Sequence, residues 1–431
     1  MKNLLKLKIG LIILVSFFIL PISAITLIHA GALFDGTGSK VSTEMSIFIE
    51  NEYILKVEKG YISPGVDDKH IDLSNYFVLP GLIDMHVHLS NEYSAKSYQE
   101  SISLNAADYS IRAVANAKKT LLAGFTSVRN LGDSNNVTVS LRNAINAGIV
   151  PGPRIFTSGT TISSSGGHGD PTNALRFGLS SDPGPEDGII NNSNDAYKAV
   201  RYRYKQGSNL IKITSTGGVL SNAKDGQNPQ LTEEEISTIV SASKDYNFKV
   251  AAHAHGAEGI KRAIRSGVDS IEHGTLMDSE GMRLMRENGV YLVPTLLAGA
   301  WVAEKAQKEG FFPDLVRPKA IEIGPKSIST FSKAYKAGVK IAFGTDTGVS
   351  AHGRNAEEFS LMVSAGMPAS EALLSATKEA SLLLGQDNIL GSLKAGMFAD
   401  VIAVSKSPIA DISILENIDF VMKNGTVYKS P

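Results

Sequence analysis

The chain has 431 residues, of which 43% are hydrophobic and 20% charged, and its formal net charge is −1. This length can hold one large domain and a smaller one, and the near-neutral charge gives no basic footprint for a nucleic-acid partner. The chain contains no cysteine, which excludes disulfides, Cys-ligated zinc and a lipid attached to a cleavage-site cysteine.

The first 24 residues have the pattern of a secretory signal. Three lysines precede a mostly apolar stretch over residues 9–20, and small residues then lead to Ala24. The stretch is shorter than the roughly 20 residues of a membrane span. The pattern at Met1 to Ala24 therefore predicts cleavage after Ala24 and a mature start near Ile25. It predicts a secreted or periplasmic protein with no stable membrane insertion, and an uncleaved anchor is the alternative.

Both ends of the remaining chain are strand-like. Residues 25–79 alternate apolar and polar positions, with a hairpin turn expected at residues 50–52. Residues 390–431 contain two more strand-like runs, and Asn424-Gly425 is a strong hairpin signal between strands. Because β-rich ends flank a middle of mixed type, they predict one small β-sandwich domain formed by the N- and C-terminal segments.

The middle, residues 80–389, alternates short apolar runs with amphipathic helical patterns, such as those over 106–124, 233–247 and 256–267. The strand-like runs cover residues 78–86, 125–130, 153–158, 209–214, 249–254, 269–273, 290–295 and 340–345. Eight βα units predict an α/β fold of the distorted (β/α)8 TIM barrel type, a metal-dependent hydrolase domain. A doubly wound open sheet also alternates in this way and is the alternative.

Ionisable residues stand at the C-terminal ends of these apolar runs: His86, His88, Lys212, His253, His273 and Asp346. In a closed parallel barrel those ends converge on one face, where active sites form. Side chains two apart on a strand share a face, so the His-x-His pair can bind one ion together. His, Asp and a modified Lys are all good ligands for a divalent metal.

Lys212 interrupts the apolar run over residues 210–213. A buried lysine is costly to keep charged, so its pKa falls. The neutral amine can react with carbon dioxide to give a carbamate, which has two oxygens and can bridge two metal ions. The alternative is an unmodified lysine that pairs with Asp346 and holds no metal.

These motifs resemble the amidohydrolase superfamily, in its binuclear-metal branch with a carboxylated lysine. The resemblance covers nearly the whole chain after the signal, through GALFDGTG, PGLIDMHVH, AAHAHG, IEHG, GTDTG and GSLKAGMFADVIAV. Within the superfamily the chain is most similar to the Xaa-Pro dipeptidase (prolidase-like) group, which includes carboxypeptidase-like enzymes and ochratoxin-hydrolysing amidases. SGGHGD, IKITSTGGV and GTDTGVSAHGRNAEEF carry this finer likeness.

The resemblance implies two divalent metal ions, zinc being expected although the ligand types also suit manganese, cobalt or iron. His86, His88 and Asp346 would hold the more buried ion, His253 and His273 would hold the second, and the Lys212 carbamate would bridge them. A hydroxide between the metals would attack the amide. As the catalytic acid-base, Asp346 would pass its proton to the leaving nitrogen. The resemblance also suggests a homo-oligomer.

Three further histidines are candidates for substrate contact. His255 follows His253 by two residues and shares its side of the strand, so it is a candidate catalytic and substrate-binding residue. His168 lies in the non-periodic stretch over 158–195, which is long enough to be functional. His352 follows the eighth run. For each of them a purely structural role is the alternative.

Two cations are candidates for a substrate carboxylate. Lys224 is the only cation in residues 217–224, where relatives carry Tyr and Arg, and this difference weakens the case for specificity towards proline. Arg129 follows the second run, and its alternative role is an ion pair with Asp133 or Asp84.

The sequence thus predicts a metal-dependent amide-bond hydrolase acting on a small peptide or amide, most simply a dipeptidase or carboxypeptidase that releases a C-terminal amino acid. A second possibility is an amidase acting on a cyclic amide, an N-acyl amino acid or a xenobiotic such as an ochratoxin-like compound. A deaminase fits less well, because single-metal deaminases of the superfamily normally lack the strand-four lysine. A non-catalytic secreted binding protein is the remote alternative.

Overall fold

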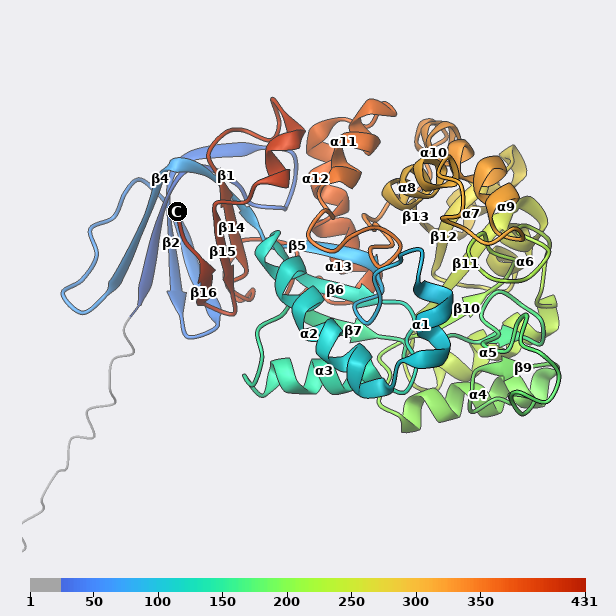
Figure 1. The fold of residues 1–431 in the computed structure, drawn as a ribbon. Coiled ribbons are helices and arrows are strands. Elements are labelled where there is room, and N and C mark those ends of the chain that lie inside the picture. The colour runs from blue at the N-terminus through green and yellow to red at the C-terminus, as the bar shows by residue number, and fades with distance from the viewer. Residues whose placement is uncertain (1–24) are drawn as a thin grey trace, which may run out of the picture.

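The computed structural model describes residues 25–431, and the predicted signal lies outside the described residues. Figure 1 shows two parts, a twisted β-sheet layer built from both ends of the chain and a larger body of helices and strands. Among the described residues, no helix is both long and apolar enough to cross a membrane.

The β-layer is one seven-stranded sheet in the order β16-β15-β14-β4-β1-β2-β3. Strand β4 joins the two ends of the chain, because it pairs in parallel with β1 and antiparallel with β14. The strands are β1 (Thr26–Phe34), β2 (Val41–Glu50), β3 (Tyr53–Lys59), β4 (Lys69–Pro80), β14 (Val401–Val404), β15 (Phe420–Lys423) and β16 (Thr426–Lys429).

The two terminal segments form one layer, as the sequence predicts, and all seven strands belong to one continuous sheet. Its inner face has a core of its own, in which Ile28 and Ile47 from the N-terminal strands pack with Val401 and Met422 from the C-terminal strands. Continuity follows from the 12-residue length of β4, which reaches both groups of strands.

Both predicted hairpin turns are confirmed. Asn51 connects β2 to β3 with φ 54°, and Asn424 and Gly425 connect β15 to β16 with φ 50° and 70°. Two successive residues with positive φ form the kind of turn that matches the twist of paired strands, and asparagine and glycine adopt it at least cost.

The larger body contains two parallel sheets, β5-β6-β7 and β10-β11-β12-β13, and a short pair β8-β9. Predicted runs one to seven are all regular strands in this body. Their bounds are β5 (Leu82–Val87), β6 (Phe125–Asn130), β7 (Arg154–Thr157), β10 (Ile211–Thr214), β11 (Val250–Gly256), β12 (Ser270–Leu276) and β13 (Tyr291–Val293), with β8 (Ser163–Ser164) and β9 (Ile189–Ile190) in the long loop.

The eighth predicted run is not a regular strand. It contacts its neighbours through isolated parallel bridges, Leu292 with Ile341 and Val87 with Thr347. Backbone bonds still join the run to β5 and β13, but the Phe343 amide donates to the Ser375 carbonyl at 3.0 Å and the Thr345 amide donates to the Asp84 side chain at 3.1 Å, so neither amide makes a ladder bond. The two parallel sheets are therefore not joined into one continuous sheet. The fold of the body is mixed α/β.

Helices follow most strands and cover the outside of both sheets (Figure 1). Thr232 and Glu235 close a capping box at the start of α5, as expected for a helix that begins with three acidic residues. The helices are α1 (Ser97–Ser103), α2 (Ala106–Leu122), α3 (Val137–Asn146), α4 (Ser193–Lys205), α5 (Glu233–Lys244), α6 (Ala257–Arg265), α7 (Ser279–Asn288), α8 (Leu296–Ala306), α9 (Arg317–Ile323), α10 (Ser327–Lys336), α11 (Glu357–Ser364), α12 (Ala369–Ser375) and α13 (Lys378–Leu384), with 3-10 turns η1 (Gly324–Lys326) and η2 (Ile412–Glu416).

Candidate active site

A single cavity of about 940 Å³, counting its open mouth, brings together residues that are up to 263 positions apart in the sequence. All six residues predicted as metal ligands line it. They come from the C-terminal ends of different strands, which is where parallel strands present their functional side chains. The six are His86, His88, Lys212, His253, His273 and Asp346.

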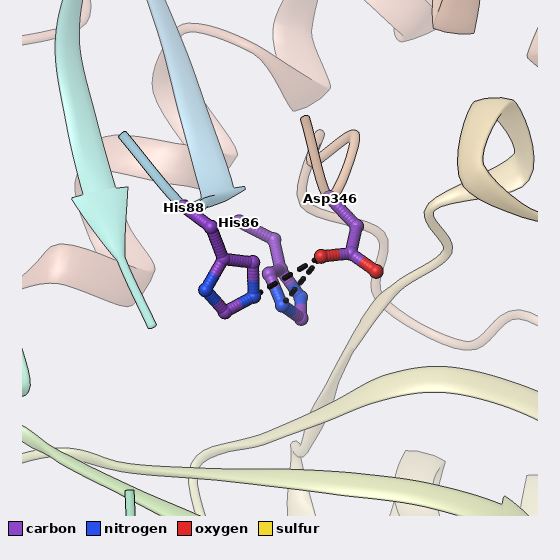
Figure 2. Close-up of side chains that lie close together, drawn as sticks. All are labelled: His86, His88 and Asp346. Carbon is purple, nitrogen blue, oxygen red and sulfur yellow. Dashed lines mark ion pairs between the residues drawn. The ribbon is translucent and has the colours of Figure 1, made fainter. Parts of the chain in front are cut away.

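His86, His88 and Asp346 form the tightest cluster, and Figure 2 shows both imidazoles facing one carboxylate. Asp346 Oδ1 lies 3.4 Å from His86 Nε2 and 3.1 Å from His88 Nε2. Burial opposes the charge of Asp346, but the two histidines outweigh it and lower the pKa of Asp346 to about 2. The carboxylate is therefore ionised at neutral pH, and its buried Oδ1 has no hydrogen-bond partner.

The Nδ1 atoms of both histidines already have hydrogen-bond partners. His86 Nδ1 lies 2.9 Å from a carboxylate oxygen of Glu272, and His88 Nδ1 lies 3.2 Å from the carbonyl oxygen of Gly132. Both partners are acceptors, so each Nδ1 donates, and the other nitrogen of a neutral imidazole, here Nε2, then carries the lone pair. Two lone pairs and the Oδ1 of Asp346 thus converge without a proton between them, which is the donor set of a divalent cation.

His253 and His273 form the second half of the site, with ring centroids 4.7 Å apart. His253 Nε2 donates to the carbonyl of Gly217 at 3.2 Å, which leaves Nδ1 as its lone-pair atom. His273 Nδ1 shares a 2.7 Å hydrogen bond with the Thr295 hydroxyl, which leaves Nε2 facing the cavity. Burial lowers the pKa of both rings well below the usual value, so both rings are neutral and each keeps one nitrogen lone pair.

Lys212 lies between the two halves, with Nζ 3.3 Å from His86 Nε2. The side chain is buried, and burial lowers the pKa of Lys212 to about 8. Among the described residues no carboxylate forms an ion pair with it, so the alternative of a Lys212–Asp346 pair within 4.0 Å is wrong. A neutral amine is thus accessible near neutral pH, which is the form that reacts with carbon dioxide.

Glu272 is a functional residue that sequence reasoning missed. It is fully buried and accepts hydrogen bonds from His86 and from Arg129, at 2.9 and 2.7 Å. Burial alone would raise its pKa, but Arg129 and His86 lower the pKa of Glu272 to about 2. The only sequence signal for a role of Glu272 is its position next to His273 in the IEH run. Regular strand alternation would point the side chains of neighbouring residues to opposite faces, so this signal is weak.

Arg129 is not at the mouth of the cavity, which corrects the prediction that it contacts substrate. Its guanidinium donates to Glu272, to the Ser270 hydroxyl and to the Met85 carbonyl, inside the body beneath the site. Its ion-pair partner is therefore Glu272, and neither Asp133 nor Asp84 takes that role.

Left-handed backbone places two of the ligands. His273 has φ 71° and Asp346 has φ 57°, and Thr295, which holds His273, has φ 49°. Such conformations are costly for residues other than glycine and gather at functional sites. The turn at His273 breaks the alternation of β12, so that both His273 and its neighbour Glu272 contact His86.

His255 and His168 also line the cavity, as predicted for substrate contacts. Burial lowers the pKa of His255 to about 4, and its Nδ1 shares a 2.9 Å hydrogen bond with the Thr275 hydroxyl. The His168 ring stacks on His253 with centroids 4.3 Å apart, and its buried Nδ1 has no hydrogen-bond partner. The Nδ1 side of the His168 ring is packed against Gly218, so the nitrogens left for a ligand are the other nitrogen of His168 and Nε2 of His255, which have no hydrogen-bond partner in the described residues.

The structure places the remaining two candidates elsewhere. His352 is buried away from the cavity, where Nε2 donates to the carbonyl of Asn91 at 2.8 Å, so its position is structural. Lys224 is exposed and does not line the cavity. The long loop after the third strand bends His168 inward, whereas the loop after the fourth strand turns Lys224 out towards solvent.

The fold and the ligand set together define a metal-binding α/β hydrolase. The amidohydrolase family model matches residues 77–428, and the chain belongs to this family. It is accordingly an enzyme that hydrolyses amide bonds.

The relatives make the placement finer. A solved Xaa-Pro dipeptidase with methionine bound in its active site is 53% identical and superimposes with a TM-score of 0.93, covering 94% of this chain and 100% of that one. A prolidase solved with N-methylphosphonate-L-proline is 30% identical, with a TM-score of 0.86 and coverage of 95% and 100%. Ochratoxinase from Aspergillus niger is 29% identical over 94% of this chain and 87% of its own length.

Proposed function

We propose that the protein is a metal-dependent dipeptidase or carboxypeptidase of the Xaa-Pro dipeptidase type, which releases a C-terminal amino acid from a small peptide. The observation that carries the proposal is the convergence of all six predicted ligands on one cavity. The 53% identical Xaa-Pro dipeptidase and the prolidase with its proline phosphonate support this substrate class.

Two divalent ions, which we propose to be zinc, fit the donor atoms. His86, His88 and Asp346 would hold one ion, and His253 and His273 would hold the other. Lys212, carboxylated by carbon dioxide, would supply one oxygen to each. When bound, such ions lower the pKa of water to near neutrality and polarise an amide carbonyl.

The protein's own groups do the remaining work. Asp346 is an ionised carboxylate at the cavity wall and would take the proton of the attacking water and deliver it to the leaving nitrogen. His255 and His168 each have a ring nitrogen facing the cavity, where an N–H would bind the amide oxygen or the carboxylate of the substrate. Glu272 fixes the orientation of the His86 ring.

The apolar part of the cavity indicates the kind of residue that is released. Among the described residues, Lys212 is the only Lys or Arg that lines the cavity, and the apolar lining includes Val219, Leu220, Ala298, Val302, Ile323 and Val349. We propose that the released amino acid is apolar, in agreement with the methionine in the related dipeptidase.

A second candidate function keeps the same site and changes the substrate. The likeness to ochratoxinase over 94% of this chain, together with the apolar wall, favours an N-acyl amino acid or a similar xenobiotic amide. The bond that breaks is still an amide to an amino acid, so only the acyl half of the substrate differs between the two proposals.

The metals and the substrate class are tested together. We expect about two zinc ions per chain by mass spectrometry, loss of hydrolysis after treatment with a chelator, and its return when zinc is added. A panel of Gly-Xaa dipeptides, read by release of free amino acid, should favour Xaa = Met, Leu or Phe over Gly and Lys. Metal with hydrolysis of N-acyl amino acids alone would move the function to the second candidate, and absence of metal would contradict both.

We propose that the larger body closes as the distorted (β/α)8 barrel, spanning residues 80–389, with the terminal segments 25–79 and 390–431 as the second domain. The two parallel sheets and the bridged segment at residues 340–347 provide the strands. We also propose a homo-oligomer, by likeness to the family.

We propose further that the protein is exported and that its first 24 residues are removed. The Ile25 backbone nitrogen lies 3.2 Å from a carboxylate oxygen of Asp68. Cleavage after Ala24 would turn this nitrogen into an α-ammonium beside a carboxylate, a favourable pairing. N-terminal sequencing of protein recovered from the periplasm or medium should therefore begin at Ile25, and an intact Met1 in that fraction would contradict the proposal.

A further inference from the structure

The loop between β10 and α5 forms one wall of the cavity. Val219 and Leu220 project from it and line the cavity opposite Val302 of α8 and Ile323 of α9. These residues belong to one apolar cluster, distinct from the main core of the body. The position of the loop tip, residues 218–223, therefore sets the width of the apolar part of the cavity.

Lys319, on α9, donates all three hydrogen bonds of its ammonium group to this loop tip. Nζ donates to the carbonyls of Gly218, Ser221 and Ala223, at 3.0, 2.8 and 2.8 Å. A lysine ammonium has three donors, so none is left for a substrate. The side chain is only 8% exposed, and a buried charge that makes three hydrogen bonds is strongly localised.

The rest of the loop is fixed in other ways. Its neck is closed by an isolated bridge between Thr216 and Pro229 and by a 3.0 Å bond from the Gly217 amide to the Asn228 carbonyl. Gly217, which also orients His253, lies within this neck. Lys319 therefore acts on the tip and on the apolar wall, while the contact between the loop and the metal ligand is held independently.

Glycine at position 226 allows the close approach of α9. A Cβ at this position would lie 3.0 Å from Lys319 Cδ and 3.0 Å from Ile323 Cδ1. A second bond supports the tip from the other side, because the Tyr98 hydroxyl of α1 donates to the Leu220 carbonyl at 2.5 Å. The tip is thus held between α1 and α9, and most of its hydrogen bonds come from Lys319.

We propose that Lys319 is a positioning residue that holds Val219 and Leu220 against the substrate and thereby makes the enzyme selective for apolar amino acids. The substrate in this proposal rests on the proposed dipeptidase function. The role of Lys319 rests on the geometry of the loop. Lys319 acts through the loop and makes no contact with substrate.

The geometry is tested first, without any substrate. In Lys319→Met, which keeps the length of the side chain and removes the donors, backbone amides of residues 218–224 should exchange hydrogen at least about tenfold faster in the zinc-loaded full-length protein. Lys326→Met is the matched control, since Lys326 is exposed in η1 and pairs only with Glu322 at 3.4 Å. Equal exchange in Lys319→Met and wild type would overturn the proposal.

Selectivity is tested next, with Gly-Met and Gly-Gly. In Lys319→Met we expect KM for Gly-Met to rise about tenfold, the size of effect that an apolar pocket supplies, while kcat and the parameters for Gly-Gly change less than about twofold. A wild type without any preference for Gly-Met would contradict the proposed function. A wild type with the preference and a Lys319→Met variant that retains it would contradict only the role of Lys319.

A second variant covers the case in which Lys319→Met does not fold. Tyr98→Phe removes the other bond to the tip and should move KM for Gly-Met in the same direction, by about threefold, with zinc content unchanged. Unchanged KM in this variant would overturn the proposal.

Discussion

Replacing Lys212 with alanine is expected to lower kcat/KM by about a thousandfold or more, which corresponds to about 4 kcal/mol of transition-state stabilisation. Lys212 is buried between the two histidine pairs, and its Nζ lies 3.3 Å from His86 Nε2. Without it, no other described lysine reaches the cavity to supply a bridging carbamate. The metal content should fall together with activity, from about two ions per chain towards one.

Short carboxylic acids distinguish a carbamate from a charged lysine. Acetate or propionate can enter the space left in Lys212→Ala and supply two oxygens, so part of the activity should return at high concentrations of acid. Lys423→Met is the matched control, because Lys423 is also a buried lysine with a pKa lowered by burial to about 8, and it bonds to the Gly152 carbonyl far from the site. Full activity of Lys212→Ala without added acid would contradict the carbamate.

Replacing Glu272 with alanine is expected to reduce the free energy of unfolding of the metal-free protein by about 3–5 kcal/mol. Glu272 has no exposed surface, and its partner Arg129 is 1% exposed. Removing the carboxylate leaves the guanidinium as an uncompensated buried charge, with bonds only to Ser270 and the Met85 carbonyl. The midpoint of urea denaturation, followed by circular dichroism in the presence of chelator, measures this loss.

The same change should weaken metal binding, because the His86 ring loses the acceptor that fixes its tautomer, an effect of about 10–100-fold in affinity. Glu280→Ala is the control for stability, since Glu280 pairs with Lys261 at the surface, where its side chain is 53% exposed. That pair should contribute less than about 1 kcal/mol. A Glu272→Ala protein as stable as the control would show that Arg129 does not depend on Glu272.

The ligands were predictable because their signal is local. His-x-His places two rings on one face of any strand. A lysine or an aspartate at the end of an apolar run is costly to bury, so its presence there indicates a functional role. All eight runs that carry or accompany them have enough β-branched and apolar residues to be recognised, and seven of them form regular strands. The candidate ligands and the family of the protein could therefore be predicted from the sequence, and the family is confirmed.

The eighth run shows where local patterns fail. Residues 340–345 have the composition of a strand, but the amides of Phe343 and Thr345 donate to the Ser375 carbonyl and to the Asp84 side chain instead of to a strand backbone. Arg129 was misplaced for the same reason, since its position at a strand end is a local fact whereas its bonds to Glu272 and Ser270 come from another strand. Strand alternation gives no signal for Glu272 beside His273, because it does not allow for the left-handed turn at His273.

The sequence by itself indicated which side chains are candidate metal ligands, because side-chain periodicity and residue chemistry act within a few positions. The tertiary structure alone decided how those side chains are held and how the cavity is shaped. Glu272 reaches His86 across 186 positions and Lys319 reaches Gly218 across 101. Such contacts carry no repeat or spacing that the sequence could display, since they exist only when separate strands and helices have packed.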